Sequence, residues 1–559
     1  MHAANASKLK EIPDGHGSLS QLACRESKRK CHTSGKDSPC TRCLRLNLRC
    51  SIMAPIDTKI ISSAVIGDDD SEILPSPEVC NELVDLYFDI IHDKDHSLFH
   101  RPSFITNQRQ GLADMMHIYA ILSLAARFFE ISDLRNKARV WAKLSKRLFD
   151  GRTEAVSLAA IQACVLLSLV AFGEGEMQME SLYGAQAVSM VQLRGFPAPL
   201  SNDAVQQETE IRVWWTVWML DNWASAGARI PRQFTVAPNF PVPMEERAFE
   251  NLRHEEPAFP IMLPSGMAGL HQYGLWAQMI PLTEVIAPIN EIHELTVQNS
   301  LTDVQLFDRV DQISYKLDSW KLHLPKALHF TPEACKSYAA TGHGRVLAAL
   351  HTGFHHFSQL LYYQFLERSS SNMAESNPRI DEYAGRCRQH AAELSNLLWV
   401  TKQTPGCECS WPMIGHLLAI SSSVNLHSLL FDDKESTIAN AKQMLKQNFE
   451  MMIYLRQYWP SIDLSMSRLQ TFHQACQRSM DSTFKMDHWM LQFLQRFTKS
   501  VGDRDASIFW EMEDPQDIYS ALPSVVANYL DYNFDGDDSQ HDQSDVSMGS
   551  KVLQGFLSN

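Results

Sequence analysis

Residues 79–90 read VCNELVDLYFDI, with apolar side chains at Val79, Leu83, Leu86 and Ile90. The spacings of four, three and four place these side chains on one face of an α-helix. Strand-like alternation is scarce and no solenoid-like repeat is evident. We therefore predict a mainly all-α protein with a large helical domain over residues 77–500. Comparable helical patterns occupy residues 115–129, 158–172, 181–193, 211–223, 345–365, 383–400, 413–430 and 442–459.

The composition is that of an ordinary globular protein. The 559 residues are 45% hydrophobic and 21% charged, which allows a sizeable core. The first 21 residues are polar and of mixed charge, so a secretory signal is not expected. The longest apolar run, residues 163–172, is shorter than the roughly 20 residues that span a bilayer. We expect an intracellular protein with no membrane partner, in which this run forms a buried helix.

The net charge of −15 conceals opposite charges at the two ends of the sequence. Up to Cys50 there are ten basic and four acidic residues, a balance of +6. Residues 503–545 hold one basic and twelve acidic residues, a balance of −11. A basic head and an acidic tail predict different partners for the two ends.

The first fifty residues contain five of the twelve cysteines, and their density is typical of a metal site. Zn²⁺ prefers tetrahedral sulfur and nitrogen ligands, and it stabilises segments too short for a hydrophobic core. The alternative, five unligated thiols, leaves this segment with only three leucines to hold it together. We predict a zinc module over residues 21–50, after a disordered N-terminus (1–20) and before a linker (51–76). The spacing is Cys24-x6-Cys31-x8-Cys40-x2-Cys43-x6-Cys50.

Basic residues fill the interval between the first two of these cysteines. They are Arg25, Lys28, Arg29 and Lys30. A lone basic triplet is most often a solvated charge run or a nuclear import signal. Flanking cysteines at these spacings favour contact with DNA instead.

The strings CRESKRKC (24–31) and SPCTRC (38–43), followed by Cys50, resemble the fungal six-cysteine binuclear zinc cluster. The pattern of that family is C-x2-C-R-x2-K-x-K-C, a loop, C-x2-C and a last cysteine. The resemblance implies a short helix in the major groove, with Lys28 reading bases and its basic neighbours on phosphates. It also implies zinc as the cofactor and double-stranded DNA with CGG-type half-sites as the partner.

One ligand position departs from the family, because its first cysteine falls at Gln21 in this sequence. In the family that cysteine bridges both zinc ions, as Cys40 would, so each ion here keeps three thiolates. Three explanations stay open. Solvent, His16 or His32 completes a two-zinc cluster; the module binds one zinc only; or the N-terminal sequence reflects a wrong exon join. We favour the last, because the fit to the family begins only after Ala23.

The middle of the chain resembles the fungal-specific transcription factor domain, also called the middle homology domain. The residues that carry the resemblance are LFHRPSF (98–104), RVWW (212–215) and RIP (229–231). It is close over residues 77–243 and weak as far as about residue 500. It implies a regulatory, all-helical domain that responds to a small-molecule effector or a partner protein.

These features predict a nuclear, sequence-specific transcription regulator of RNA polymerase II genes, specific to a metabolic or secondary-metabolite pathway. Residues 501–559 are predicted to be a disordered activation segment that folds on coactivators. The alternative is a regulator with a degenerate zinc cluster that acts through protein partners without binding DNA itself. No heptad follows the module, so a homodimer is neither specified nor excluded. The aromatic side chains predicted to act in the tail are Trp510, Tyr519, Tyr529, Tyr532 and Phe534.

A third interpretation, a helical metalloenzyme, rests on two groups of histidines. His92, His96 and His100 would share one face of a helix that Pro102 ends. No H-E-x-x-H motif or paired acid accompanies them, so we predict no catalytic residue and no enzyme. The second group is His351, His355 and His356.

Two other features have structural interpretations. Trp214, Trp215 and Trp218 suggest a ligand cage, but aromatic residues at helical spacing are more often core. The seven cysteines beyond Cys50 are predicted to be small buried hydrophobes.

Overall fold

The computed structural model describes residues 74–504, except 95, 155, 196–200, 229–230, 235–239, 255, 258–273 and 368–376. Within these ranges the chain forms helices and no strand, and one isolated antiparallel bridge joins Asp203 to Pro257. The prediction of a mainly all-α protein is therefore confirmed for this part of the chain.

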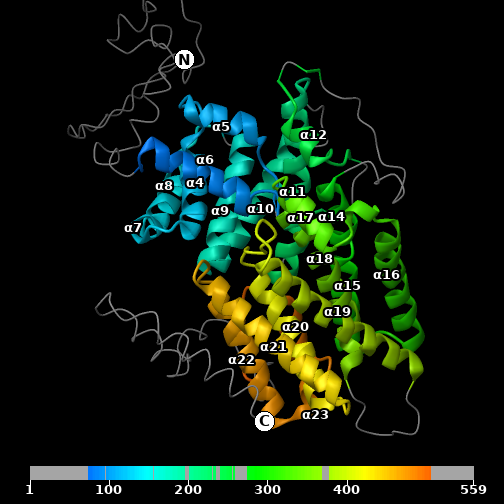
Figure 1. The fold of residues 1–559 in the computed structure, drawn as a ribbon. Coiled ribbons are helices and arrows are strands. Elements are labelled where there is room, and N and C mark those ends of the chain that lie inside the picture. Colours follow the sequence, from blue (N-terminus) through cyan, green and yellow to red (C-terminus); the bar gives the residue numbers. More distant parts are fainter. Residues whose placement is uncertain are drawn as a thin grey trace, which may run out of the picture. The chain divides into compact units, whose positions relative to one another are not determined.

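Figure 1 shows α9–α11 between the early helices α4–α8 and the later helices α14–α19. The short turns of π- or 3-10 helix are η2 (Tyr87–Ile91), η3 (Ala126–Phe128), η5 (Lys326–Leu328) and η6 (Tyr363–Leu366). The α-helices are α4 (Pro77–Leu86), α5 (Arg101–Arg109), α6 (Met115–Ala125), α7 (Ser132–Asn136), α8 (Ala138–Asp150), α9 (Leu158–Glu174), α10 (Met177–Arg194), α11 (Ala204–Ala228), α12 (Glu246–Glu250), α14 (Leu275–Thr283), α15 (Ile286–Val297), α16 (Asp303–His323), α17 (Pro332–Ala339), α18 (Gly344–Tyr362), α19 (Pro378–Lys402), α20 (Ile414–Phe431), α21 (Glu435–Arg456), α22 (Ile462–Arg478), α23 (Met480–Thr483) and α24 (His488–Gln495).

The helix predicted from residues 79–90 is present as α4, and η2 continues it. Ser76 caps its first turn by accepting a hydrogen bond from the Val79 N–H. Of the four predicted stripe residues only Leu83 is fully buried, whereas Val84 and Tyr87 are also buried. The core-facing stripe is thus rotated relative to the prediction, because α4 packs its Val84 side against α6.

The predicted buried run, residues 163–172, lies in α9. Ser157 caps this helix through the Ala160 N–H, and Gly175 ends it in the left-handed region at φ +81°. Most residues between these ends are buried, and α9 packs along α10. The prediction of a buried helix is confirmed.

Helix α20 is long and apolar enough to cross a membrane by length and composition alone, with a mean hydropathy of 1.3. However, 83% of this helix is buried inside the fold, where it packs against α19, α21 and α22. A helix that is apolar all round and buried in this way is typical of a protein core.

The residues predicted to be core are buried. Trp214, Trp215 and Trp218 are at most 2% exposed, and the Trp215 indole N–H donates to the Pro241 carbonyl at 2.7 Å. Their core interpretation is confirmed. The seven later cysteines are buried and unbridged, as predicted: Cys80, Cys164, Cys335, Cys387, Cys407, Cys409 and Cys476.

Candidate effector cavity in the helical domain

The residues predicted to bind zinc, DNA and coactivators lie outside the described part of the chain, so their roles stay predictions. The zinc and DNA residues are Cys24, Cys31, Cys40, Cys43, Cys50, Arg25, Lys28, Arg29 and Lys30. The tail residues are Trp510, Tyr519, Tyr529, Tyr532 and Phe534. The candidate site that the structure itself offers is a cavity in the helical domain.

This cavity has a volume of about 150 Å³ and lies between helices. Side chains from α9, α10, α11, α14, α18 and α20 line it, so segments far apart in the sequence meet there. The segments that follow η2, precede α20 and follow α24 complete the lining. Cavities between the helices of a bundle are common sites for small ligands.

Aromatic side chains form much of the cavity wall. The Trp223 ring lies 5.5 Å from the Phe357 ring and 6.5 Å from the Phe497 ring, and the Phe172 and Phe497 rings are 5.9 Å apart. Trp411 also lines the cavity. Such rings offer apolar surface and electron-rich faces to a ligand. The methionines of the lining are Met219, Met279 and Met413.

Phe497 belongs to the segment that follows α24, and this segment is firmly held. A Cβ at Gly227 of α11 would lie 2.6 Å from the Phe497 ring, so only glycine allows this approach. The Thr498 hydroxyl donates to the Gly227 carbonyl at 3.0 Å. The buried Arg468 guanidinium donates at 2.6 Å to the carbonyls of Arg496 and Lys499, and burial lowers its pKa to about 9. One wall of the cavity is thus formed by a segment that directly precedes the acidic tail in the sequence.

Two charged side chains line the cavity, and they differ in their partners. Lys94 donates to the carbonyls of Phe88, Asp89 and His92, which engage all three of its N–H groups, and burial lowers its pKa to about 7. Glu180 is 5% exposed, accepts a hydrogen bond from the Ser181 hydroxyl at 3.0 Å, and has its pKa raised to about 7 by burial.

His356 supplies a further polar group to the cavity lining. It is fully buried, and burial lowers its pKa to about 3, so the ring is neutral. The Gln359 amide donates to Nδ1 at 3.2 Å, which leaves the ring proton on Nε2. Nε2 has no hydrogen-bond partner among the described residues. The Trp223 ring stacks on this imidazole at 6.0 Å.

The histidines predicted to share a helical face do not lie on a helix. The helix ends at Ile91, residues 92–94 and 96–100 are not helical, and Pro102 lies in the first turn of α5 rather than at the C-terminal end of a helix. The prediction was wrong because a π turn ends the earlier helix. His92 Nε2 accepts hydrogen bonds from the N–H groups of Leu98 and Phe99, and His96 bonds the Tyr87 hydroxyl at 2.9 Å. These rings organise the loop.

The second histidine group is spread over separate partners on α18. His351 donates to the Leu328 carbonyl at 2.7 Å, and His355 lies 3.1 Å from a ring nitrogen of His390. Among the described residues, no group of three or more His, Cys, Asp or Glu side chains is arranged to hold a metal ion.

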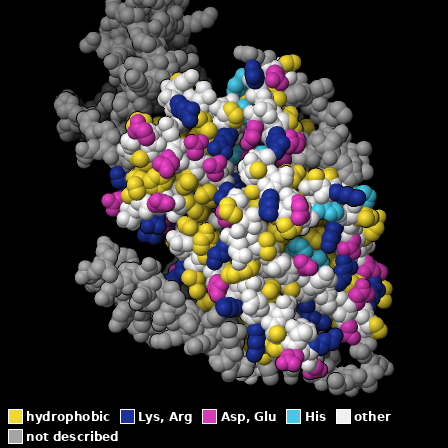
Figure 2. Space-filling view, viewed as in Figure 1, with side chains coloured by type: hydrophobic (Ala, Val, Ile, Leu, Met, Phe, Trp, Pro, Cys, Tyr) yellow, Lys and Arg dark blue, Asp and Glu magenta, His cyan; other side chains and the backbone are white. Residues whose placement is uncertain are grey.

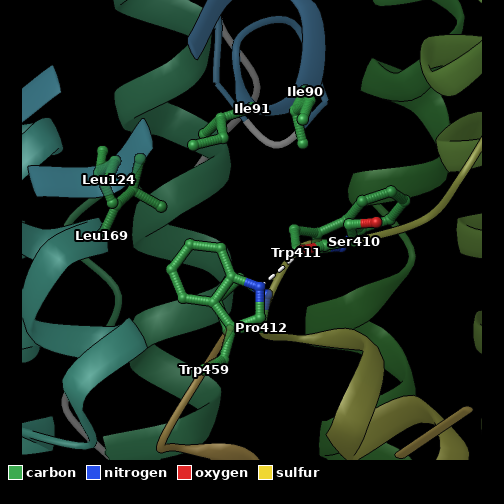
Figure 3. A pocket seen from close by; sticks show the side chains of 8 residues that line it. All are labelled: Ile90, Ile91, Leu124, Leu169, Ser410, Trp411, Pro412 and Trp459. Carbon is green, nitrogen blue, oxygen red and sulfur yellow. Dashed lines mark hydrogen bonds between the residues drawn. The ribbon is translucent and has the colours of Figure 1, made fainter. Parts of the chain in front are cut away.

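A much smaller hollow of about 10 Å³ adjoins the cavity, and Leu169 and Trp411 line both. Figure 3 shows Ile90 and Ile91 across this hollow from Trp459, whose indole N–H donates to the Ser410 carbonyl at 2.6 Å. A space of this size holds at most about one water molecule. The larger cavity is therefore the candidate ligand site.

A buried ionic network surrounds Arg212 of α11, the first residue of the RVWW string. Arg212 is 1% exposed and donates to Glu208 at 2.8 Å and to the Met244 carbonyl at 2.8 Å. Glu246 accepts hydrogen bonds from the N–H groups of Leu275 and Trp276 at the start of α14. This network links α11, α12 and α14, and its members are satisfied within the protein.

The fold and its internal cavity fit a helical regulatory domain. Residues 84–272 match the family model of the fungal specific transcription factor domain. The middle of the chain is therefore similar to the regulatory domain of fungal transcription factors, as the sequence predicts.

Several curated proteins are similar to this chain. A transcriptional regulatory protein of Schizosaccharomyces pombe is 21% identical over 358 residues, which cover 57% of this chain and 35% of that protein. The Zn(2)-C6 fungal-type transcription factor FTF1c of Fusarium oxysporum f. sp. lycopersici is 23% identical over 201 residues, 32% of this chain and 21% of that protein. The chain thus spans about a third or less of the length of these relatives. They are named as transcription factors or regulators, which agrees with the prediction that the chain is no enzyme.

Sequence reasoning missed the residues that give the cavity its chemistry, notably Glu180, Trp223 and Phe497. Nothing in the sequence sets Glu180 apart from Glu174 and Glu176, which are close to it in the chain. Figure 2 adds that acidic and basic side chains are interspersed on the face it shows, with no continuous basic stripe. That face of the helical domain does not have the charge pattern of a DNA-binding surface.

Proposed function

We propose that the chain is a nuclear, sequence-specific transcription regulator of RNA polymerase II genes, dedicated to one metabolic or secondary-metabolite pathway. Residues 21–50 bind DNA, residues 77–500 regulate, and residues 501–559 recruit coactivators. The observation that carries this proposal is the match of residues 84–272 to the fungal specific transcription factor domain. In the sequence this region follows a basic segment with five cysteines, which resembles the fungal binuclear zinc cluster.

In the proposed DNA-binding module, thiolates hold zinc and basic side chains meet DNA. Cys24, Cys31, Cys40, Cys43 and Cys50 would hold the zinc through their thiolates. Zinc replaces the hydrophobic core that so short a segment lacks. Lys28 donates to guanine in a CGG-type half-site, while Arg25, Arg29 and Lys30 contact phosphates.

The alternative function is a regulator that works through protein partners because Gln21 has replaced a bridging ligand. Zinc content measured by mass spectrometry on the purified full chain separates the two functions. Two zinc ions per chain and salt-dependent binding to a CGG duplex are expected for the first. A chain without zinc or DNA affinity supports the second. In that case a Gln21→Cys variant that regains both would identify this ligand as the cause.

Base reading is tested on the same chain. Lys28→Ala is expected to weaken binding to the CGG duplex by about 1 to 3 kcal/mol and to relax base preference. Lys36→Ala is the matched control, since it removes a charge within the module but outside the reading segment. An unchanged preference in a binding-site selection with Lys28→Ala refutes the assigned role.

The tail and the cavity complete the proposal. Deleting residues 503–559 is expected to abolish activation of a reporter gene while DNA binding persists. Equal reporter output from the truncated chain would contradict an activating tail. The cavity supports the further part of the proposal, that a small molecule acts as the effector of the helical domain.

A further inference from the structure

Glu180 is a buried carboxylate that the surrounding fold does not neutralise. It lies in the first turn of α10, is 5% exposed, and lines the cavity. In the described part of the chain no lysine, arginine or histidine lies within 4 Å of it, and the Ser181 hydroxyl is its side-chain partner. An ionised carboxylate buried without a cation is costly. A cationic ligand would remove that cost.

The other charged side chain of the lining does not fill this role. Lys94 is the only lysine or arginine that lines the described cavity, and three backbone carbonyls already engage its ammonium group. It therefore has no N–H group left for an anionic ligand. The charge that the cavity offers to a ligand is the negative charge of Glu180.

The remaining wall suits the apolar part of an amine and its positive charge. Phe172, Trp223, Phe357, Trp411 and Phe497 come from five different parts of the chain and converge on one space. Aromatic faces attract ammonium groups, most strongly where water is excluded. A carboxylate beside several aromatic rings is the arrangement that recognises organic cations rather than anions.

The size of the cavity limits the ligand. An apolar protein cavity of about 150 Å³ holds benzene, and this cavity has about the same volume. One ring or a compact branched alkyl group, with a short arm that carries the amine, fills such a space. A polycyclic compound or a peptide does not fit without rearrangement.

We propose that this cavity binds a small organic amine, about one aromatic ring in size, whose ammonium group pairs with the Glu180 carboxylate. The unpartnered Nε2 of His356 donates a hydrogen bond to an acceptor on the ligand where one is present. The proposal rests on the proposed function only in making this amine the effector of a regulator. The binding itself does not depend on DNA or zinc.

The test uses the full chain and three probes of nearly equal shape in isothermal titration calorimetry. They are 2-phenylethylamine, the neutral 2-phenylethanol and the anionic phenylacetate. The amine is expected to bind most tightly, and Glu180→Gln is expected to weaken it by about tenfold or more while leaving the alcohol unchanged. Glu284→Gln is the matched control, a half-buried carboxylate next to the lining residue Thr283 that does not itself line the cavity.

A second variant tests the location of the bound amine independently of charge. Ala349→Leu fills part of the cavity with apolar volume and is expected to abolish binding of both amine and alcohol. Thermal unfolding of each variant verifies that it is folded. Equal affinity of the amine for Glu180→Gln and the parent, tighter binding of phenylacetate, or no binding of any probe each overturns the proposal. Loss of zinc or DNA binding would overturn the proposed function and leave these titrations unaffected.

Discussion

Two buried glutamates in this domain have their pKa raised to about 7 by burial, but their surroundings differ. Glu208, on α11, accepts hydrogen bonds from the Arg212 guanidinium at 2.8 Å and the Met244 N–H at 2.9 Å. Glu180, on α10, has only the Ser181 hydroxyl and faces a cavity. At Glu208 a cation and a backbone N–H of the fold offset part of the cost of burying the carboxylate, whereas at Glu180 no cation among the described residues does so. The first region therefore holds the fold together, and the second is built to bind.

The largest expected effect comes from breaking the ionic network. Arg212→Ala leaves Glu208 buried without its cation, and removing one partner of a buried ion pair costs about 3 to 5 kcal/mol. Glu246 also loses the positive charge that favours its ionised form. The free energy of unfolding, measured with urea, is expected to fall by about 4 kcal/mol.

The matched control is a surface pair. Arg309 and Glu291 form an ion pair at 2.9 Å with both side chains exposed, and such pairs contribute less than about 1 kcal/mol. Arg309→Ala is expected to leave the urea midpoint almost unchanged. A loss as large as that of Arg212→Ala would show that charge alone, rather than burial, sets the effect.

Helix α11, which carries Arg212, was also among the helices that could be predicted from the sequence. Helices α9, α11 and α20 were predicted because runs of apolar residues make their burial unmistakable. Helix α16 (Asp303–His323) was not predicted, because its surface exposes Val304, Tyr315 and Leu322 beside charged residues and blurs the apolar pattern. The histidine loop was misread because nothing in the sequence marks a helix that ends as a π turn.

The cavity was beyond sequence reasoning for a different reason. Its lining comes from six helices and three non-helical segments, and no sequence motif joins these residues. Glu180 is one acid among 65 acidic residues in the chain. Its distinction is the absence of a cationic partner, which depends on packing between segments that are distant in the sequence.

A second, slightly smaller effect is expected at the wall beside the tail. Phe497 is 6% exposed and packs on Gly227 and Trp223. Phe497→Ala is expected to lower the free energy of unfolding by about 3 kcal/mol, near the lower limit for such changes because the site already adjoins a cavity. Thermal or urea unfolding measures it. A loss below about 1 kcal/mol would mean that the segment after α24 contributes little to the fold.

The smallest expected effect separates the two glutamates by pH. In the unfolded chain Glu180 has a pKa near 4.5, and in the folded chain about 7. Below pH 4.5 it is protonated in both states and costs nothing. Between pH 4.5 and 7 the unfolded chain releases this proton while the folded chain keeps it, so stability falls over this range and levels off above pH 7. Glu180→Gln cannot ionise and is expected to be more stable than the parent by about 2 to 3 kcal/mol at pH 8, with the gain vanishing near pH 4.

Glu208 has a pKa raised to the same extent, but Glu208→Gln is expected to gain less at pH 8, because it also removes the negative charge that compensates Arg212 and leaves the guanidinium buried with a neutral partner. Urea unfolding of both variants between pH 4 and 8 makes the comparison. If Glu180→Gln destabilises the protein at pH 8, the Glu180 carboxylate is already paired within the fold. The cavity would then offer no unpaired carboxylate to a cationic ligand.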